Sequence, residues 1–153
     1  MLSGRPVRQR SYDRRKDMDN RKELLSEILK RVQRNYRRIV EIERLTKELG
    51  EAFSRNDHDS AQLLLKMRGD EMDEATQTKY EIQTLVFDVD EEKRHDVEAW
   101  LRGEESGDLQ EFEAAKIWEL SSQIKQTVKR TMTLDKAISS RMAGDNSYYH
   151  SLS

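Results

Sequence analysis

Three long stretches of the chain repeat apolar residues every three or four positions, which is the spacing of one face of an α-helix. The stretches cover residues 25–53, 61–101 and 112–142. No comparable stretch alternates apolar and polar residues strictly, as a half-buried strand would. The pattern therefore predicts an all-α chain with three long helices.

Short polar residues followed three positions later by Glu or Gln predict where these helices begin, because this spacing is that of a capping box. The three pairs are Asn20 with Glu23, Asp59 with Gln62, and Asp108 with Glu111. Gly144 is the residue expected to end the last helix. We expect helices over about 20–54, 59–102 and 108–143, within a single helical domain of residues 18–144. The pattern weakens at Gly69 and across 88–96, where it permits a bend or an interruption.

The connections between the three helices are short, so neighbouring helices are expected to be antiparallel. Their apolar positions recur at close to 3.5 residues, which suits packing at shallow crossing angles. The predicted fold is an elongated antiparallel three-helix bundle with coiled-coil-like packing. Such a bundle leaves most side chains in water, which accounts for a content of 38% charged residues against 35% hydrophobic residues.

The two ends of the chain lack the periodicity. Residues 1–17 are expected to form a flexible basic arm, and residues 145–153 a short tail. The net charge is only −2, but basic residues dominate the first fifty positions and acidic residues dominate the rest. We expect the two charges to neutralise each other within the folded molecule or to meet complementary partners. The basic side chains of the arm are Arg5, Arg8, Arg10, Arg14, Arg15 and Lys16.

Composition and motifs exclude most kinds of chemistry. The chain has no cysteine, so disulfides and cysteine-ligated metals are excluded. Glu92 and His95 have the Glu-x-x-His spacing of di-iron bundles, but no second copy occurs, so we expect no metal. No glycine-rich phosphate loop and no Gly-x-Ser-x-Gly turn is present. We therefore expect no catalytic residues, no cofactor and no enzyme.

The same features bear on location and on nucleic acid. No window of about 18 apolar residues is present, so we expect no membrane span. The arginine-rich start has no apolar core after it and is not a secretory signal. These features favour a cytoplasmic protein. The basic arm could contact phosphates, but the acidic remainder opposes this and no known nucleic-acid module is visible, so nucleic acid is not an expected partner.

The last helix carries the candidate partner-binding surface. Its final turns are low in charge, and small residues separate their apolar positions. Methionine side chains adapt to varied partner surfaces, so part of this stripe is a candidate groove for an amphipathic helix. Packing in the bundle core is the alternative role for the same residues. The candidate partner-binding residues are Ile124, Val128, Met132, Leu134, Ile138 and Met142.

Three segments of the chain resemble bacterial flagellar export chaperones of the FlgN-like and FliT-like kind. The first is the long helix that carries Leu25, Leu29, Val32, Tyr36, Ile39 and Leu45. The second is the turn at residues 53–57 with the leucine-rich helix start at 63–72. The third is the terminal stretch 134–142. The resemblance covers about residues 20–143.

The resemblance implies a cytosolic chaperone without a cofactor. Its client would be a flagellar axial subunit, such as a hook–filament junction subunit, or a cap subunit, held by its C-terminal helical segment in a groove and passed to the type III export apparatus. Two other hypotheses remain from the residues alone: a coiled-coil scaffold protein unrelated to flagella, and a metal enzyme. The sequence leaves open whether the protein is a monomer or a homodimer.

Overall fold

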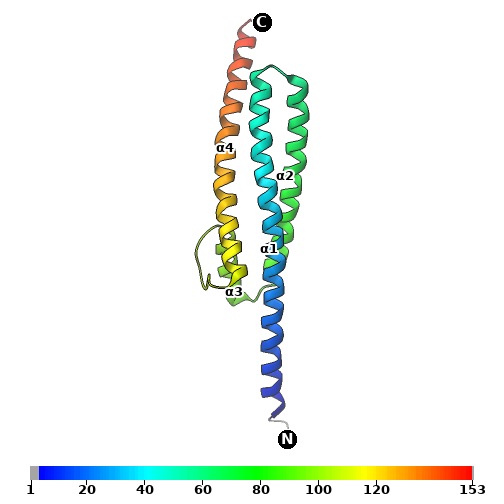
Figure 1. Ribbon diagram of the computed structural model, residues 1–153, viewed down its shortest axis with the longest axis vertical. Helices are drawn as coiled ribbons and strands as arrows, with labels where there is room; N and C mark the ends of the chain where they lie inside the picture. The colour runs from blue at the N-terminus through cyan, green and yellow to red at the C-terminus, as the bar shows by residue number, and fades with distance from the viewer. Residues whose placement is uncertain (1–3, 153) are drawn as a thin grey trace. The chain divides into compact units, whose positions relative to one another are not determined.

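The computed structural model describes the backbone of residues 4–152 and the side chains of residues 20–142. Within these residues the chain is all-α and contains no strand, as predicted. It has four helices, so the predicted count of three is wrong. They are α1 (Gly4–Ser54), α2 (His58–Phe87), α3 (Glu91–Leu101) and α4 (Phe112–Leu152) (Figure 1). Residues 1–3 of the expected arm and residue 153 of the expected tail lie outside the described residues.

The chain divides into two compact units. The first unit comprises residues 1–33 and 80–122, and the second comprises 34–79 and 123–153. Each boundary falls inside a helix, so α1, α2 and α4 each contribute one segment to each unit, while α3 belongs to the first unit alone.

The first helix begins at Gly4 rather than near residue 20. Asn20 therefore lies inside α1 and is not its N-cap. Pro6 does not prevent this early start, because proline is tolerated in the first turn, where backbone N–H groups lack intrahelical partners anyway. At the other end, α4 continues through Gly144 to Leu152. Glycine lowers helix propensity but does not by itself end a helix.

Asn56 and Asp57 shape the turn that joins α1 to α2. Asn56 adopts a left-handed conformation with φ of 56°, and its N–H donates to the carbonyl of Phe53. The N–H of Asp57 donates to the carbonyl of Ala52 at 2.9 Å, which completes a Schellman motif. The Asp57 carboxylate then accepts the N–H of Ser60 at 3.1 Å. Asp57, and not Asp59, is thus the N-cap of α2.

The second predicted helix is interrupted within the weak segment 88–96. The N–H groups of Asp88 and Val89 turn back to the carbonyls of Leu85 and Val86, and α3 starts after Asp90. The guanidinium of Arg94 donates to the carbonyls of Phe87 at 2.8 Å and Val89 at 3.0 Å. Arg94 therefore satisfies the last carbonyl of α2 and one carbonyl of the turn that follows it.

Hydrogen bonds hold the connection between α3 and α4 against α3. Gly103, with φ of 78°, ends α3, and the indole N–H of Trp100 donates to the carbonyl of Ser106 at 2.6 Å. The hydroxyl of Ser106 donates to the carboxylate of Asp96. Asp108, the expected N-cap, instead accepts the N–H of Gln110 at 2.9 Å in a local turn, and α4 begins later, at Phe112.

The interior of the first unit is almost entirely apolar. Twelve of the eighteen buried apolar side chains that the structure describes belong to this unit. Among the described residues, Ser121 is the one buried polar residue of this unit. The twelve are Leu25, Ile28, Leu29, Val32, Ile82, Val86, Val89, Val97, Ala99, Trp100, Ala114 and Ile117. Burial of such side chains is the main favourable contribution to folding.

The interior of the second unit is more polar. It buries the other six described apolar side chains together with four threonines, Thr46, Thr78, Thr127 and Thr131. Three of these threonines return a hydrogen bond to a carbonyl of their own helix, as Thr46 does to Ile42 at 2.7 Å. Arg68 of α2 donates to Thr46 at 3.4 Å and to the carboxylate of Asp135 in α4 at 2.7 Å. A polar network therefore joins all three segments of this unit.

The residues that contact one another between helices define the helix register in the second unit. Between α1 and α2 the partners run in opposite orders, since Asn35 contacts Ala75 while Thr46 contacts Arg68. Between α1 and α4 they rise together, since Glu43 pairs with Arg130 at 3.1 Å and Gly50 lies against Ile138.

Candidate functional site

A groove of about 480 Å³ lies between α1 and α4 in the second unit. We call it the α1–α4 groove. Four lining residues come from the last turns of α1, Arg55 follows directly after that helix, and four come from α4; six of these nine are exposed. The lining residues are Lys47, Gly50, Glu51, Ser54, Arg55, Leu134, Ala137, Ile138 and Arg141.

The lining follows helical spacing on both sides. The four α4 positions are 134, 137, 138 and 141, and the four α1 positions are 47, 50, 51 and 54. Both helices therefore present residues at i, i+3, i+4 and i+7. Such residues share one face of a helix. Since α1 and α4 pair in rising order, the groove follows the two helices. From residue 47 to residue 55 it spans about 12 Å, or roughly two turns of helix.

The floor of the groove is made of small and aliphatic residues. A Cβ atom added to Gly50 would lie 3.1 Å from Cδ1 of Ile138, so this glycine allows the isoleucine to pack directly against the α1 backbone. Ile138 is only 5% exposed, and Leu134, one turn earlier, is half-buried. Ala137 is exposed beside them. The groove thus presents apolar surface that small residues keep open.

The rim of the groove is mainly basic. Lys47 and Glu51 of α1 and Arg55, the residue after its end, follow one another at intervals of four, and all three are exposed. Arg141 stands on the α4 side and is also exposed. The Lys47 ammonium lies 3.9 Å from a carboxylate oxygen of Glu43, a long ion pair in water. Three cations and one carboxylate therefore surround the apolar floor.

The six residues predicted to bind a partner do not form one surface in the structure. Leu134 and Ile138 line the α1–α4 groove. Ile124 and Val128 are half-buried and are not part of its lining. Met132 is 66% exposed and Met142 is 38% exposed. Neither methionine is part of the groove lining. Met132 lies one turn before Asp135, the residue of α4 that meets Arg68 of α2.

The α1 wall of the groove was not predicted from the sequence. Its residues belong to the end of the first apolar stripe, where Gly50 and Ser54 are small residues four positions apart next to the buried Leu49. This spacing of small residues on a helix flank is the signal that was available. Their proximity to residue 138 follows only from the packing of α4 on α1.

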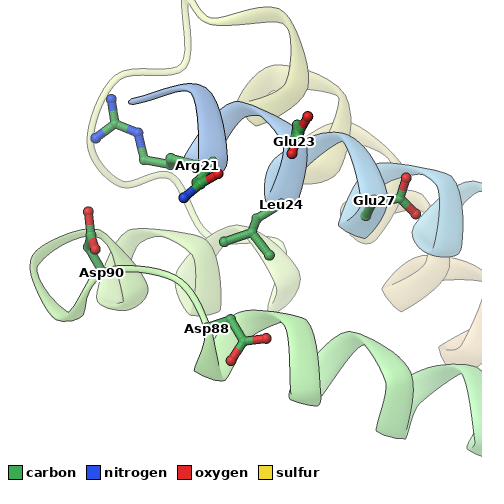
Figure 2. Close-up of a pocket in the computed structure, with 7 residues that line it drawn as sticks. Arg21, Glu23, Leu24, Glu27, Asp88 and Asp90 are labelled. Atoms are coloured by element: carbon green, nitrogen blue, oxygen red, sulfur yellow. The ribbon is translucent and has the colours of Figure 1, made fainter. Parts of the chain in front are cut away.

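A second hollow, of about 510 Å³, lies in the first unit. Figure 2 shows Leu24 projecting from α1 toward the segment with Asp88 and Asp90, with Glu23 and Glu27 also on α1. Arg31 at 2.9 Å and Lys30 at 3.1 Å hold the pKa of Glu27 below its ordinary value, so this carboxylate is already engaged. The remaining acids form a solvated surface.

The candidate metal motif is not assembled. Glu92 and His95 are both exposed on α3. Across the side chains that the structure describes, no three histidine or acidic residues gather closely enough to hold a metal ion.

A further apolar surface surrounds the Arg68–Asp135 ion pair. Leu65 and Met72 lie within one turn of Arg68 on α2, and they are 43% and 41% exposed. On α4, Met132 lies three residues before Asp135 and Met142 seven residues after it, and both are exposed. An added Cβ at Gly69 would meet nothing within 4 Å, so the surface is open at that point. We call these four exposed side chains, on α2 and α4 of the second unit, the exposed patch.

Among the described residues, no helix has both the length and the apolar character needed to cross a membrane. No family model, curated protein or solved structure matches the chain.

Proposed function

We propose that this protein is a cytoplasmic export chaperone that captures an amphipathic helical segment of a client protein in the α1–α4 groove. One observation carries the proposal: an apolar floor of Leu134, Ala137 and Ile138 remains open between two helices, and a charged rim borders it. A client helix laid along this floor would complete an antiparallel, coiled-coil-like bundle.

The groove has the dimensions and surface that helix-in-groove recognition uses. A length of about two turns accommodates apolar anchors at i, i+3 or i+4, and i+7. Covering the floor would remove the exposed apolar surface of Ala137 and of the half-buried Leu134 from water. Ordering a disordered client segment would oppose binding, so the affinity would be moderate and release easy.

The resemblance to FlgN-like and FliT-like chaperones supports the identity of the client. We propose the C-terminal helical segment of a flagellar hook–filament junction or cap subunit, delivered afterwards to the type III export apparatus. The chaperone itself would perform no covalent chemistry. Its effect would be to shield the apolar face of the client until export.

The test is to block the groove with a large side chain. Ala137→Trp should fill it without disturbing the core, because Ala137 is exposed. With labelled C-terminal segments of junction and cap subunits from the same genome, we expect the wild type to bind one of them. The variant should bind it at least ten-fold more weakly, measured by fluorescence anisotropy.

Ser139→Trp is the matched control, since Ser139 is exposed on the same helix but does not line the groove. It should bind as the wild type does. The flagellar assignment is wrong if no junction or cap segment binds, and groove capture is wrong if both tryptophan variants bind equally well.

A homodimeric scaffold is the second candidate, and the exposed patch of Leu65, Met72, Met132 and Met142 favours it. Two copies that cover this patch would bury apolar surface on both sides. Light scattering across a dilution series distinguishes this scaffold, which would keep the mass of a dimer, from a monomeric chaperone.

A further inference from the structure

We infer that the client segment is acidic, with carboxylates along both flanks of its apolar face. This inference rests on the proposed capture of a client in the α1–α4 groove and specifies the chemistry of that client. It follows from the order of charges on the rim, which apolar periodicity alone does not determine.

The rim of α1 offers a cation, an anion and a cation in turn. Lys47 and Glu51 lie four residues apart on α1, and the N–H of Arg55 donates to the Glu51 carbonyl at 3.1 Å, so the three residues form one row. Two cations and one anion make this row basic on balance, so a client helix beside it is favoured when it presents carboxylates opposite Lys47 and Arg55.

The other rim makes one end of the groove more basic. Glu43 pairs with Arg130 and Gly50 lies against Ile138, so equivalent levels on α4 and α1 differ by about 87 residues. Arg141 therefore lies at nearly the same level as Ser54 and Arg55. The two guanidiniums border the same end of the groove from opposite sides. Guanidinium groups bind carboxylates in a planar two-bond arrangement, so a client acid is favoured at this end.

The interior acids nearby do not cancel this field. Glu43, the carboxylate nearest to Lys47, already holds Arg130 at 3.1 Å. Arg55 interacts electrostatically with the carboxylate of Asp57, outside the groove lining, but the three cations of the lining still outnumber its one carboxylate, Glu51. The groove therefore keeps an excess of positive charge, which accelerates encounter with acidic segments and disfavours basic ones.

Two labelled peptides of about 16 residues test the inference. Both are alanine-based helices with leucines on one face, and the flanks carry glutamate in one peptide and lysine in the other. We expect the glutamate peptide to bind the wild type at least ten-fold more tightly, and more weakly as salt is raised.

Charge reversal on the rim should invert this preference. The variant carries Lys47→Glu, Arg55→Glu and Arg141→Glu, all at exposed positions where folding is retained, as circular dichroism can verify. It should bind the lysine peptide at least ten-fold more tightly than the glutamate peptide. A control of equal net charge carries Arg37→Glu, Lys66→Glu and Lys129→Glu, which are exposed positions of the same unit outside the groove, and should keep the wild-type preference.

The outcomes separate the inference from the proposed function. If both peptides bind the wild type equally and Ala137→Trp abolishes binding of both, groove capture stands and the acidic client is wrong. The acidic client is also wrong if the control reversal changes the preference as much as the rim reversal does. If neither peptide binds, or if Ala137→Trp binds both as the wild type does, groove capture itself is wrong.

Discussion

Single residues decide where the helices of this chain end and begin. Asn56 accepts a left-handed conformation that most residues avoid, and Asp57 supplies the acceptor that starts α2. Ser60 hydrogen bonds, from its hydroxyl first and its N–H second, hold the pKa of Asp57 below its ordinary value of 3.8. The ionised carboxylate is therefore the form that the folded protein favours.

This preference predicts a pH dependence at one residue. Because the folded pKa of Asp57 is lower than the unfolded pKa, the unfolded chain takes up the proton first as the pH falls. The stabilisation is complete above the ordinary value of 3.8 and is lost as the pH falls through the lower folded pKa. Asp57→Asn keeps a capping acceptor but cannot ionise.

We expect the wild type and Asp57→Asn to converge in urea midpoint as the pH is lowered from 7 to 2. Asp57→Ala removes the cap altogether and should be less stable than Asp57→Asn throughout this range. A difference between wild type and Asp57→Asn that stays constant over the whole range would show that the ionised cap does not contribute.

At the scale of elements, the junction between α2 and α3 depends on one arginine. Arg94 lies 4.9 Å from the centroid of the Phe87 ring and donates to the carbonyls of Phe87 and Val89. These contacts stabilise the break between the helices and accompany the burial of Val89, which is 2% exposed.

Removing this arginine should loosen the junction. We expect Arg94→Ala to lower the free energy of unfolding by about 2 kcal/mol, because hydrogen bonds to a charged donor are lost. Hydrogen exchange should accelerate at residues 85–92. Arg94→Lys should recover part of this stability, since both hydrogen bonds come from one guanidinium nitrogen, Nη2, and an ammonium also has several donors on one nitrogen.

Arg102→Ala serves as the comparison, because Arg102 is exposed and pairs with the nearby Glu104 at 3.3 Å. Exposed pairs of this kind contribute between about 0 and 1 kcal/mol. Equal losses of stability in the Arg94 and Arg102 variants would contradict the capping role of Arg94.

At the scale of the whole molecule, the two units differ in the chemistry of their interiors. The first unit buries twice as many of the described apolar side chains as the second, whose interior includes four threonines and the Arg68 network. Hydroxyl groups contribute less on burial than methyl groups do, even when they are hydrogen-bonded. The unit with the α1–α4 groove is therefore the less apolar one.

We expect the second unit to unfold at lower denaturant than the first. Trp100 and Trp118 are the two tryptophans of the chain and both belong to the first unit, so their fluorescence reports on it alone. Far-ultraviolet circular dichroism reports on the helices of both units. The urea midpoint should be lower by circular dichroism than by fluorescence.

Backbone hydrogen exchange gives a second measure. Amides of residues 34–54 and 58–79 should exchange faster than those of residues 25–33 and 114–122. Coincident midpoints, together with uniform protection along α1, would mean that the polar interior does not weaken the second unit.

The sequence by itself determined the all-α character and the apolar faces, because helical periodicity is a local property of neighbouring residues. It also placed Leu134 and Ile138 among the candidates, and these two residues line the groove. The sequence did not determine the bounds of the helices, where Asp57 and Asp59 compete as caps and Arg94 acts from beyond the break.

Only the tertiary structure decided what the candidate surface is. The wall formed by Lys47, Gly50 and Arg55 reaches Ile138 through a register between segments about 87 residues apart, which no local pattern encodes. The same packing left Met132 and Met142 exposed and outside the groove lining. Helix formation depends on residues near one another in sequence, whereas a groove depends on which helices pack together and at what level.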